Sequence, residues 1–147
     1  MKKLELVGLK ACPHCKRAIA YLLTEDGQHT LGIALDTSRA REFSTYQEPG
    51  REKFLTDLLM QLLASSSYIP RQVVLDWNEE GFLFAKVDLT TQIFSCSAQD
   101  GIAFVAAMGI PFYATERILA QRHLFHPPDT ESESTDLIQL KLKPTLH

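Results

Sequence analysis

Two cysteines near the start of the chain have a spacing that suits redox or metal chemistry. Cys12 and Cys15 enclose a proline and a histidine in the sequence CPHC. A Cys-x-x-Cys pair between a strand and a helix is typical of thiol oxidoreductases, because the helix N-terminus lowers the pKa of the first thiol and makes it the nucleophile. The next residues do not fit that arrangement, since residues 18–23 have no polar helix face and an Asp-Gly turn follows. A thiol redox protein is therefore an alternative hypothesis.

Two histidines near the other end of the chain could join these cysteines in a metal site. Cys12, Cys15, His123 and His126 form a C-x₂-C and an H-x₂-H pair, which are ligands that zinc accepts. The usual histidine spacing is about three to five intervening residues, and cationic side chains are also common at the end of a helix. The third cysteine, Cys96, ends a predicted strand and is interpreted as a small buried apolar residue.

A single acidic residue, Asp100, stands in the most apolar part of the chain, residues 95–114. The spacing from Ser97 to Asp100 predicts the start of a helix, and Gly109 followed by Pro111 predicts its end. Because nearly every residue between them is apolar, we expect this helix to lie in the core. Asp100 then has two interpretations: it caps the helix start, or it is an acid at the mouth of a site.

The first half of the chain predicts a strand, a hairpin and two helices. Residues 3–9 alternate as a half-buried strand, and residues 18–23 and 30–35 flank an Asp-Gly pair that is typical of a type I′ hairpin turn. A short polar helix is expected over residues 37–47 and an amphipathic helix over residues 51–65. The apolar stripe of the second helix consists of Phe54, Leu55, Leu58, Leu59, Leu62 and Leu63.

The second half predicts an antiparallel meander of three strands, followed by the apolar helix and shorter elements. The strands are residues 72–77, 82–89 and 92–96. After the apolar helix we expect a short strand at 110–113, a helix at 116–123 capped by Thr115, an acidic segment at 129–136 and a strand at 137–143. That last strand is suited to pairing with its own sheet or with a partner chain. 

These elements predict an α+β protein with a mostly antiparallel or mixed sheet and two to three helices. Residues 1–126 form the single expected domain, and residues 127–147 an acidic linker plus a C-terminal strand. No Gly-rich phosphate loop and no Gly-x-Ser-x-Gly sequence occur, so nucleotide-binding and serine-hydrolase functions have no support.

The charge distribution limits the partners of the chain. The net charge is −3, and residues 1–23 carry five basic side chains and one acidic side chain, so that this segment sums to +4 and the remainder to −7. Nucleic-acid binding would need that local basic cluster or a patch built by an oligomer. No run approaches the roughly 18 apolar residues of a membrane span. With three cysteines, an odd count typical of a reducing compartment, we expect a cytoplasmic protein without membrane contact.

The order of elements resembles the bifunctional nuclease domain family across residues 4–121. Four segments carry the resemblance: residues 31–35 (LGIAL) resemble its LPIxIG strand, 55–59 (LTDLL) its THDLL helix start, 81–87 (GFLFAKV) its GTFYAxL strand, and 95–113 its DARPSDAIALAxxxGxPIY segment. The resemblance implies an α+β domain that forms a homodimer and has DNase and RNase activity.

The departures from the family fall on polar positions. Ser95 and Ser97 replace the leading Asp and Arg of DARPSD, whereas Asp100 is kept, and in THDLL the Asp is kept as Asp57. The resemblance implies that Asp57 and Asp100 form an acidic pair that holds Mg²⁺ or Mn²⁺, with Arg39 holding phosphate. Two alternatives stay open: a binding or regulatory member that has lost catalysis, and a structural role for Asp57 in the first turn of its helix.

Overall fold

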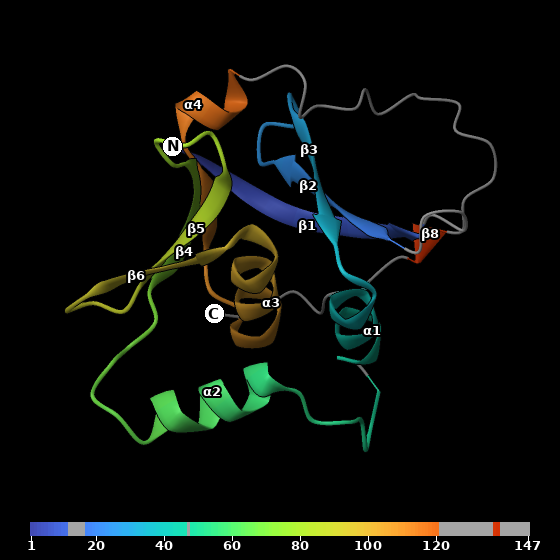
Figure 1. Ribbon diagram of the computed structural model, residues 1–147, viewed down its shortest axis with the longest axis vertical. Helices are drawn as coiled ribbons and strands as arrows, with labels where there is room; N and C mark the ends of the chain where they lie inside the picture. Colours follow the sequence, from blue (N-terminus) through green and yellow to red (C-terminus); the bar gives the residue numbers. More distant parts are fainter. Residues whose placement is uncertain (12–16, 47, 121–136, 139–147) are drawn as a thin grey trace.

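The chain folds as an α+β protein, in which one mixed sheet carries its helices mainly on one face (Figure 1). The computed structural model describes residues 1–11, 17–46, 48–120 and 137–138. Within these residues the strands are β1 (Lys2–Ala11), β2 (Ala18–Thr24), β3 (Thr30–Leu35), β4 (Gln72–Trp77), β5 (Leu83–Asp88), β6 (Ile93–Ser97), β7 (Phe112–Ala114) and β8 (Leu137–Ile138). The helices are α1 (Thr37–Thr45), α2 (Leu55–Ala64), α3 (Ala98–Met108) and α4 (Glu116–Leu119). The α+β prediction is thus confirmed.

The sheet has the strand order β3-β2-β1-β7-β4-β5-β6, with β8 paired to β1. Among the described strands, only β4 and β7 pair in parallel, and the predicted meander of β4, β5 and β6 is antiparallel. The strand near the C-terminus therefore joins its own sheet, since Leu9 of β1 lies opposite Ile138. None of the helices in these ranges is long and apolar enough to cross a membrane.

The hairpin of β2 and β3 forms as predicted, but its turn differs from the expected type I′ geometry. Gly27 has a positive φ of 71°, whereas Asp26 is absent from the described non-glycine residues with positive φ. Asp26 instead accepts hydrogen bonds from the Thr24 hydroxyl at 2.6 Å and the Gln28 amide at 3.0 Å. Its side chain thereby organises a longer loop, which the Asp-Gly pair alone did not predict.

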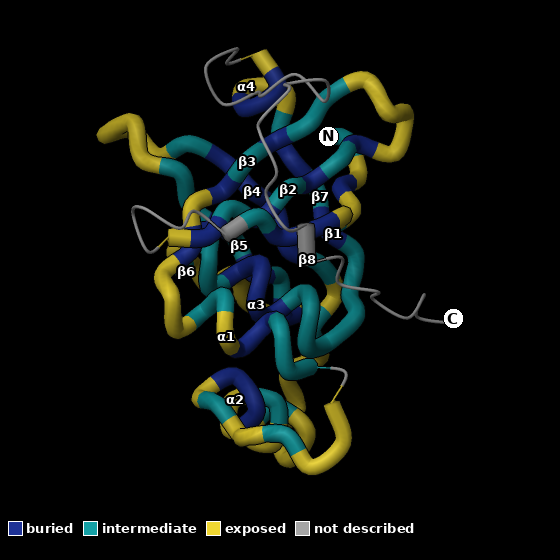
Figure 2. Tube along the Cα trace, turned by 90° about the vertical axis from the view of Figure 1, so that its right-hand side faces the viewer, coloured by how far each residue is buried: buried dark blue, intermediate teal, exposed yellow. Residues whose placement is uncertain are grey.

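Helix α3 begins, ends and packs as the sequence predicts. The Ser97 hydroxyl accepts the Asp100 amide at 3.2 Å, and Gly109 ends the helix at a φ of 67°. Its middle is buried against β4 and β5 (Figure 2), and at Gly101 an added Cβ would lie 2.4 Å from the Cβ of Ala85. This close approach requires glycine and sets α3 directly on the sheet, which fixes the position of Asp100 at its first turn.

Helix α2 forms within the predicted range, but four of its five leucines are exposed and Leu63 is the one that packs against the core. Leu55, Leu58, Leu59 and Leu62 are 73%, 50%, 43% and 58% exposed. The helix packs against α3 at the end of the molecule farthest from α4 (Figures 1 and 2). An amphipathic pattern shows that a helix has an apolar face, but not that the same chain covers it.

Helix α4 is attached to the sheet through a buried carboxylate, Asp76 of β4. The described helix ends at Leu119 with Ala120 as its C-cap, and residues 121–123 of the predicted helix lie outside the described residues. Thr115 precedes the helix as predicted, but its hydroxyl donates to Asp76 at 2.8 Å, and no side-chain capping bond forms. Arg117 binds the other Asp76 oxygen at 2.7 Å. Asp76 thus ties the start of α4 to the sheet.

Candidate functional site

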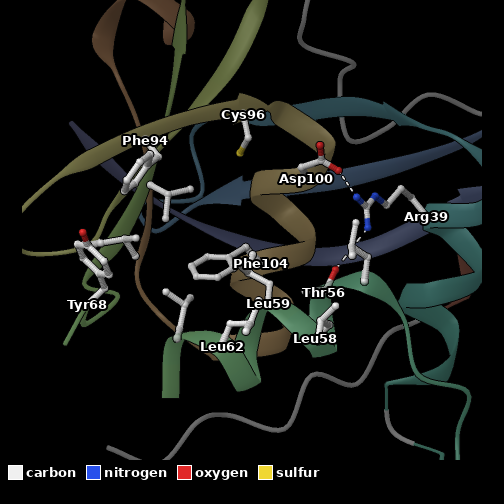
Figure 3. A pocket seen from close by; sticks show the side chains of 14 residues that line it. Arg39, Thr56, Leu58, Leu59, Leu62, Tyr68, Phe94, Cys96, Asp100 and Phe104 are labelled. Atoms are coloured by element: carbon white, nitrogen blue, oxygen red, sulfur yellow. Dashed lines mark hydrogen bonds and ion pairs between the residues drawn. The ribbon is translucent and has the colours of Figure 1, made fainter. Parts of the chain in front are cut away.

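A pocket of about 590 Å³ lies between α2, α3 and the β5–β6 hairpin (Figure 3). Its walls are apolar except at one end. The apolar lining residues are Leu55, Leu58, Leu59, Leu62, Leu63, Tyr68, Val87, Leu89, Phe94, Cys96 and Phe104. Both the size and the apolar lining are within the range of small-molecule sites.

The periodicity of each element explains why these side chains meet. The leucines of α2 recur three and four residues apart and therefore share the helix face that borders the pocket. Alternate residues of a strand point to the same side of its sheet, so Phe94 and Cys96 of β6 both reach the pocket. Tyr68 packs edge-on to Phe94, with ring centroids 6.5 Å apart, at the end of the pocket away from its polar groups (Figure 3).

Three helices supply the polar end of the pocket. Arg39 of α1 forms an ion pair with Asp100 of α3 and lies 3.4 Å from the hydroxyl of Thr56 in α2 (Figure 3). The same guanidinium binds Glu42 at 2.6 Å, and the Glu42 side chain is only 2% exposed. Arg39 therefore lies between a buried carboxylate and a more exposed one.

A second, polar pocket of about 320 Å³ adjoins this end. Both pockets are lined by Arg39, Leu55 and Asp100. The remaining residues around the polar pocket are Asp36, Ser38, Glu42, Phe54 and Gln99. The Arg39–Asp100 ion pair thus stands where an apolar cavity meets a polar one.

The two neighbouring carboxylates, Glu42 and Asp100, keep Arg39 charged and bound to them. Burial lowers the pKa of Arg39, but the hydrogen bond to Glu42 and the charge of Asp100 outweigh it, and the net pKa is raised. Both terminal nitrogens of Arg39 already donate to protein acceptors. A phosphate bound at Arg39, the role predicted for this residue, would have to compete with these two carboxylates for the charge of the guanidinium.

The predicted acidic residues Asp57 and Asp100 lie at the two ends of one polar network. From Asp100 and Arg39 it continues through Glu42, which accepts the Tyr46 hydroxyl at 2.6 Å. Arg51 stacks on the Tyr46 ring at 4.9 Å and forms an ion pair with Asp57. Burial, together with the bond to Glu42, raises the pKa of Tyr46, so this phenol is a neutral donor. The structure therefore connects all three of the predicted polar site residues.

Asp57 holds the start of α2. One oxygen accepts the Phe54 amide at 2.7 Å, and both oxygens are bound by Arg51. The Arg51 hydrogen bond is the main reason that the pKa of Asp57 is lowered. This geometry matches the structural alternative given for Asp57. Asp100 does not cap its own helix, because Ser97 does so and the Asp100 carboxylate turns to Arg39.

Only some of the residues named in the metal and redox predictions belong to the described residues. Across residues 1–11, 17–46, 48–120 and 137–138, no three His, Cys, Asp or Glu side chains are grouped to hold a metal ion. Cys12, Cys15, His123 and His126 lie outside these residues. Cys96 is half-buried at the pocket wall, where burial and the nearby Asp100 charge raise its pKa to about 11. Its thiol is therefore protonated at neutral pH.

Three members of the network were not predicted: Glu42, Tyr46 and Arg51. The spacing of Arg39, Glu42 and Tyr46, three and four residues apart in a predicted helix, was the available signal. Arg51 had no comparable signal, because its partner Asp57 is in the next helix.

Comparison with known proteins identifies two relatives but no family. No family model matches the chain. Two Mycobacterium tuberculosis proteins, Uncharacterized protein MT1877 and Uncharacterized protein Rv1829, are each 25% identical over 143 residues, which cover 95% of this chain and 87% of the relative. Neither name states an activity, so the functional argument depends on the geometry of the site.

Proposed function

We propose that the chain is a ligand-binding protein on a fold similar to that of the bifunctional nuclease domain, and that its ligand occupies the apolar pocket. One observation carries this proposal: α2 presents half-exposed leucines to an open cavity instead of packing them. Burying apolar surface contributes about 25 cal/mol for each Å², so these side chains offer a ligand a favourable surface. Contiguous exposed apolar surface of this kind is typical of binding sites.

Polar contacts attach the start of α2 to the rest of the molecule. Asp57 joins the helix start to Arg51, and Thr56 contacts Arg39, with both Thr56 and Asp57 buried. These contacts anchor the start of the helix, while Leu55, Leu58, Leu59 and Leu62 remain exposed. A pocket that is already formed loses less conformational entropy when a ligand binds.

The surroundings of Asp57 also favour binding over catalysis at this residue. Asp57 accepts three hydrogen bonds from Arg51 and Phe54, and Asp100 is paired with Arg39. A carboxylate that acts as metal ligand or base must offer a free oxygen to its partner. Asp57 has none that is free of these protein donors.

A fluorescence titration with N-phenyl-1-naphthylamine, a neutral apolar probe, tests this function. We expect saturable enhancement with the wild type and a loss of at least about tenfold in affinity for Cys96→Phe, whose ring would fill the pocket. Ser95→Phe is the matched control, because the neighbouring strand position points to the opposite side of the sheet. The absence of saturable binding to the wild type, or equal effects of the two variants, would contradict the proposal.

A metal-dependent nuclease is the second candidate, favoured by the meeting of Asp100, Glu42 and Arg39 at the polar pocket. Mg²⁺ is often held by only one or two carboxylates together with waters and substrate phosphates, so Asp100 is the residue that could take part. The proposed substrates are DNA and RNA, and Mg²⁺ or Mn²⁺ the proposed cofactor.

Cleavage assays distinguish this candidate from pure binding. Labelled single- and double-stranded DNA and RNA would be incubated with the reduced protein and Mg²⁺, Mn²⁺ or EDTA. Metal-dependent cleavage that disappears in Asp100→Asn would establish the nuclease, because a contaminant would not respond to the substitution. No cleavage under any condition would remove this candidate.

A homodimer is the proposed assembly, formed by edge pairing of β6 with β6 of a second copy. Among the described strands, β6 pairs only with β5, and its side chains Ile93 and Phe94 are exposed. An unprotected edge strand with apolar side chains favours pairing with another chain. An antiparallel pair of identical strands gives the self-complementary interface that a two-fold dimer requires.

The low, odd cysteine count supports a reducing compartment, and we propose the cytoplasm as the location of the protein.

A further inference from the structure

We infer that the ligand of the apolar pocket carries a cationic head group, such as a primary ammonium, which binds to Asp100. This inference rests on the proposed binding function and adds the chemical class of the ligand. It depends on the surroundings of two residues at the polar end, Asp100 and Arg39.

Asp100 is the carboxylate that a ligand in the pocket can reach. It lines both the apolar and the polar pocket, and its side chain is 43% exposed. Its Oδ1 binds Arg39, and no hydrogen bond from the described residues reaches its Oδ2, which lies away from the dashed contact in Figure 3. One carboxylate oxygen is therefore available at the junction of the two cavities.

Arg39 is already shared between two carboxylates, so an anionic head group would have to compete with Glu42 and Asp100 for its charge. One terminal nitrogen donates to Glu42 and lies near Thr56, and the other donates to Asp100. Separating Arg39 from the buried Glu42 would leave a carboxylate without its counter-charge in the interior, which is strongly unfavourable. An anion at this end would also lie close to the negative charges of Glu42 and Asp100.

The charges around the polar pocket favour a cation in the same way. Asp36, Glu42 and Asp100 line it, against Arg39 as the one basic residue among its lining side chains. An ammonium at Asp100 would form a charge-assisted hydrogen bond, while an attached apolar chain extends toward Tyr68 and Phe94. The chemistry that fits is therefore an apolar body with one positively charged end.

Three probes with the same ten-carbon chain and different heads test this inference: decylammonium, decanol and decanoate. Isothermal titration calorimetry would be carried out at pH 7 with the two charged probes below their critical micelle concentrations and decanol below its solubility limit. We expect decylammonium to bind at least about tenfold more tightly than decanol and decanoate, the size of one charge-assisted contact. Asp100→Asn should remove this preference and leave decanol affinity unchanged.

Glu80→Gln is the matched control, since Glu80 is an exposed carboxylate in the β4–β5 turn. It should leave all three affinities unchanged. Equal binding of decanol and decylammonium, tighter binding of decanoate, or a decylammonium preference that survives Asp100→Asn would overturn the cationic head while leaving the pocket as a binding site. Failure of all three probes to bind would overturn the proposed function itself.

Discussion

Asp57 and Asp100 are both aspartates that form an ion pair with an arginine, but their surroundings give them different roles. Asp57 is buried at the first turn of α2, where Arg51 and the Phe54 amide occupy both of its oxygens. Asp100 is partly exposed and keeps one oxygen at the pocket. The first residue stabilises the scaffold, and the second is available to a ligand.

Asp57→Asn should therefore lower the free energy of unfolding by about 1–3 kcal/mol, because a neutral amide loses the charge-assisted bonds to Arg51 and the helix start. Urea denaturation measures the change. Asp100→Asn is the comparison, and its effect should be below about 1 kcal/mol, since exposed ion pairs contribute little. If Asp57→Asn had a higher free energy of unfolding than the wild type, the Asp57 carboxylate would destabilise the fold. That result would indicate that Asp57 has a chemical role and not a structural one.

The buried carboxylate Asp76 predicts a pH dependence of stability. Burial of Asp76 raises its pKa. Hydrogen bonds from Arg117, Thr115, the Trp77 amide and Lys86 lower the pKa by more than burial raises it, and the net pKa is about 2. Because the folded pKa lies below the unfolded value of about 3.9, the stabilisation is fully present above that pH and is lost as pH falls toward 2.

Chemical denaturation of the wild type and Asp76→Asn across this range provides the test. The wild type should be more stable by about 1–2 kcal/mol at neutral pH. The difference should narrow as the pH falls below the unfolded Asp value. A difference that stays constant down to the folded pKa would contradict the assignment of the carboxylate as the stabilising group.

The elements differ in how much of their environment the sequence reveals. The limits and burial of α3 could be predicted because Ser97, Gly109 and the apolar residues between them act locally. The end of α2 was predicted to within one residue, but the helix begins at Leu55 and not at residue 51. The exposure of Leu58 and Leu62 was not predicted, because it depends on which surfaces of the folded chain lie opposite the helix. The hairpin was predicted, whereas the side-chain bonds of Asp26 changed its turn.

At the helix–sheet contact, Gly101→Ala should destabilise the protein by about 1–3 kcal/mol, because the new methyl group would overlap Ala85. Helix propensity alone predicts the opposite sign, since alanine favours helices over glycine. Thermal unfolding of Gly101→Ala, Ala85→Gly and the double variant measures the coupling. The double variant should be more stable than the sum of the single effects, and strict additivity would contradict the steric explanation.

At the pocket wall, truncating a leucine of α2 should cost little stability. Leu62→Ala is expected to lower the free energy of unfolding by less than about 1 kcal/mol, against about 2–5 kcal/mol for the buried Leu75→Ala. Urea denaturation compares the two. Only Leu62→Ala should weaken probe binding directly, and a large stability loss in that variant would show that α2 packs as core.

At the scale of the whole molecule, the polar end of the site joins side chains from three helices that are far apart in sequence. Arg39 and Asp100 are sixty-one positions apart, and their pairing depends on α1 and α3 packing on the same region of the molecule. The resemblance to a nuclease family suggested both residues, but it could not reveal that Glu42 already neutralises Arg39. The Arg39–Glu42 pair lies within one helix at a spacing of three residues, whereas the Arg39–Asp100 pair follows from the fold and not from a motif.

The exposed edge of β6 makes a prediction about assembly. Ile93→Lys should convert the proposed homodimer to a monomer, because a lysine opposes edge pairing and removes an apolar contact. Size-exclusion chromatography with light scattering measures the mass of each protein. Glu80→Gln should stay dimeric, and a wild type that is monomeric at all concentrations would contradict edge pairing.

The most direct test of the binding pocket is methyl NMR of leucine- and valine-labelled protein during titration with decylammonium. We expect saturable shift changes confined to the methyl groups of the pocket wall, at Leu58, Leu59, Leu62, Leu63, Val87 and Leu89. The methyl groups of core residues remote from the pocket, such as Leu22 and Leu31, should not move. Changes spread over the whole molecule, or no saturable change at the pocket wall, would contradict the claim that this cavity is the binding site.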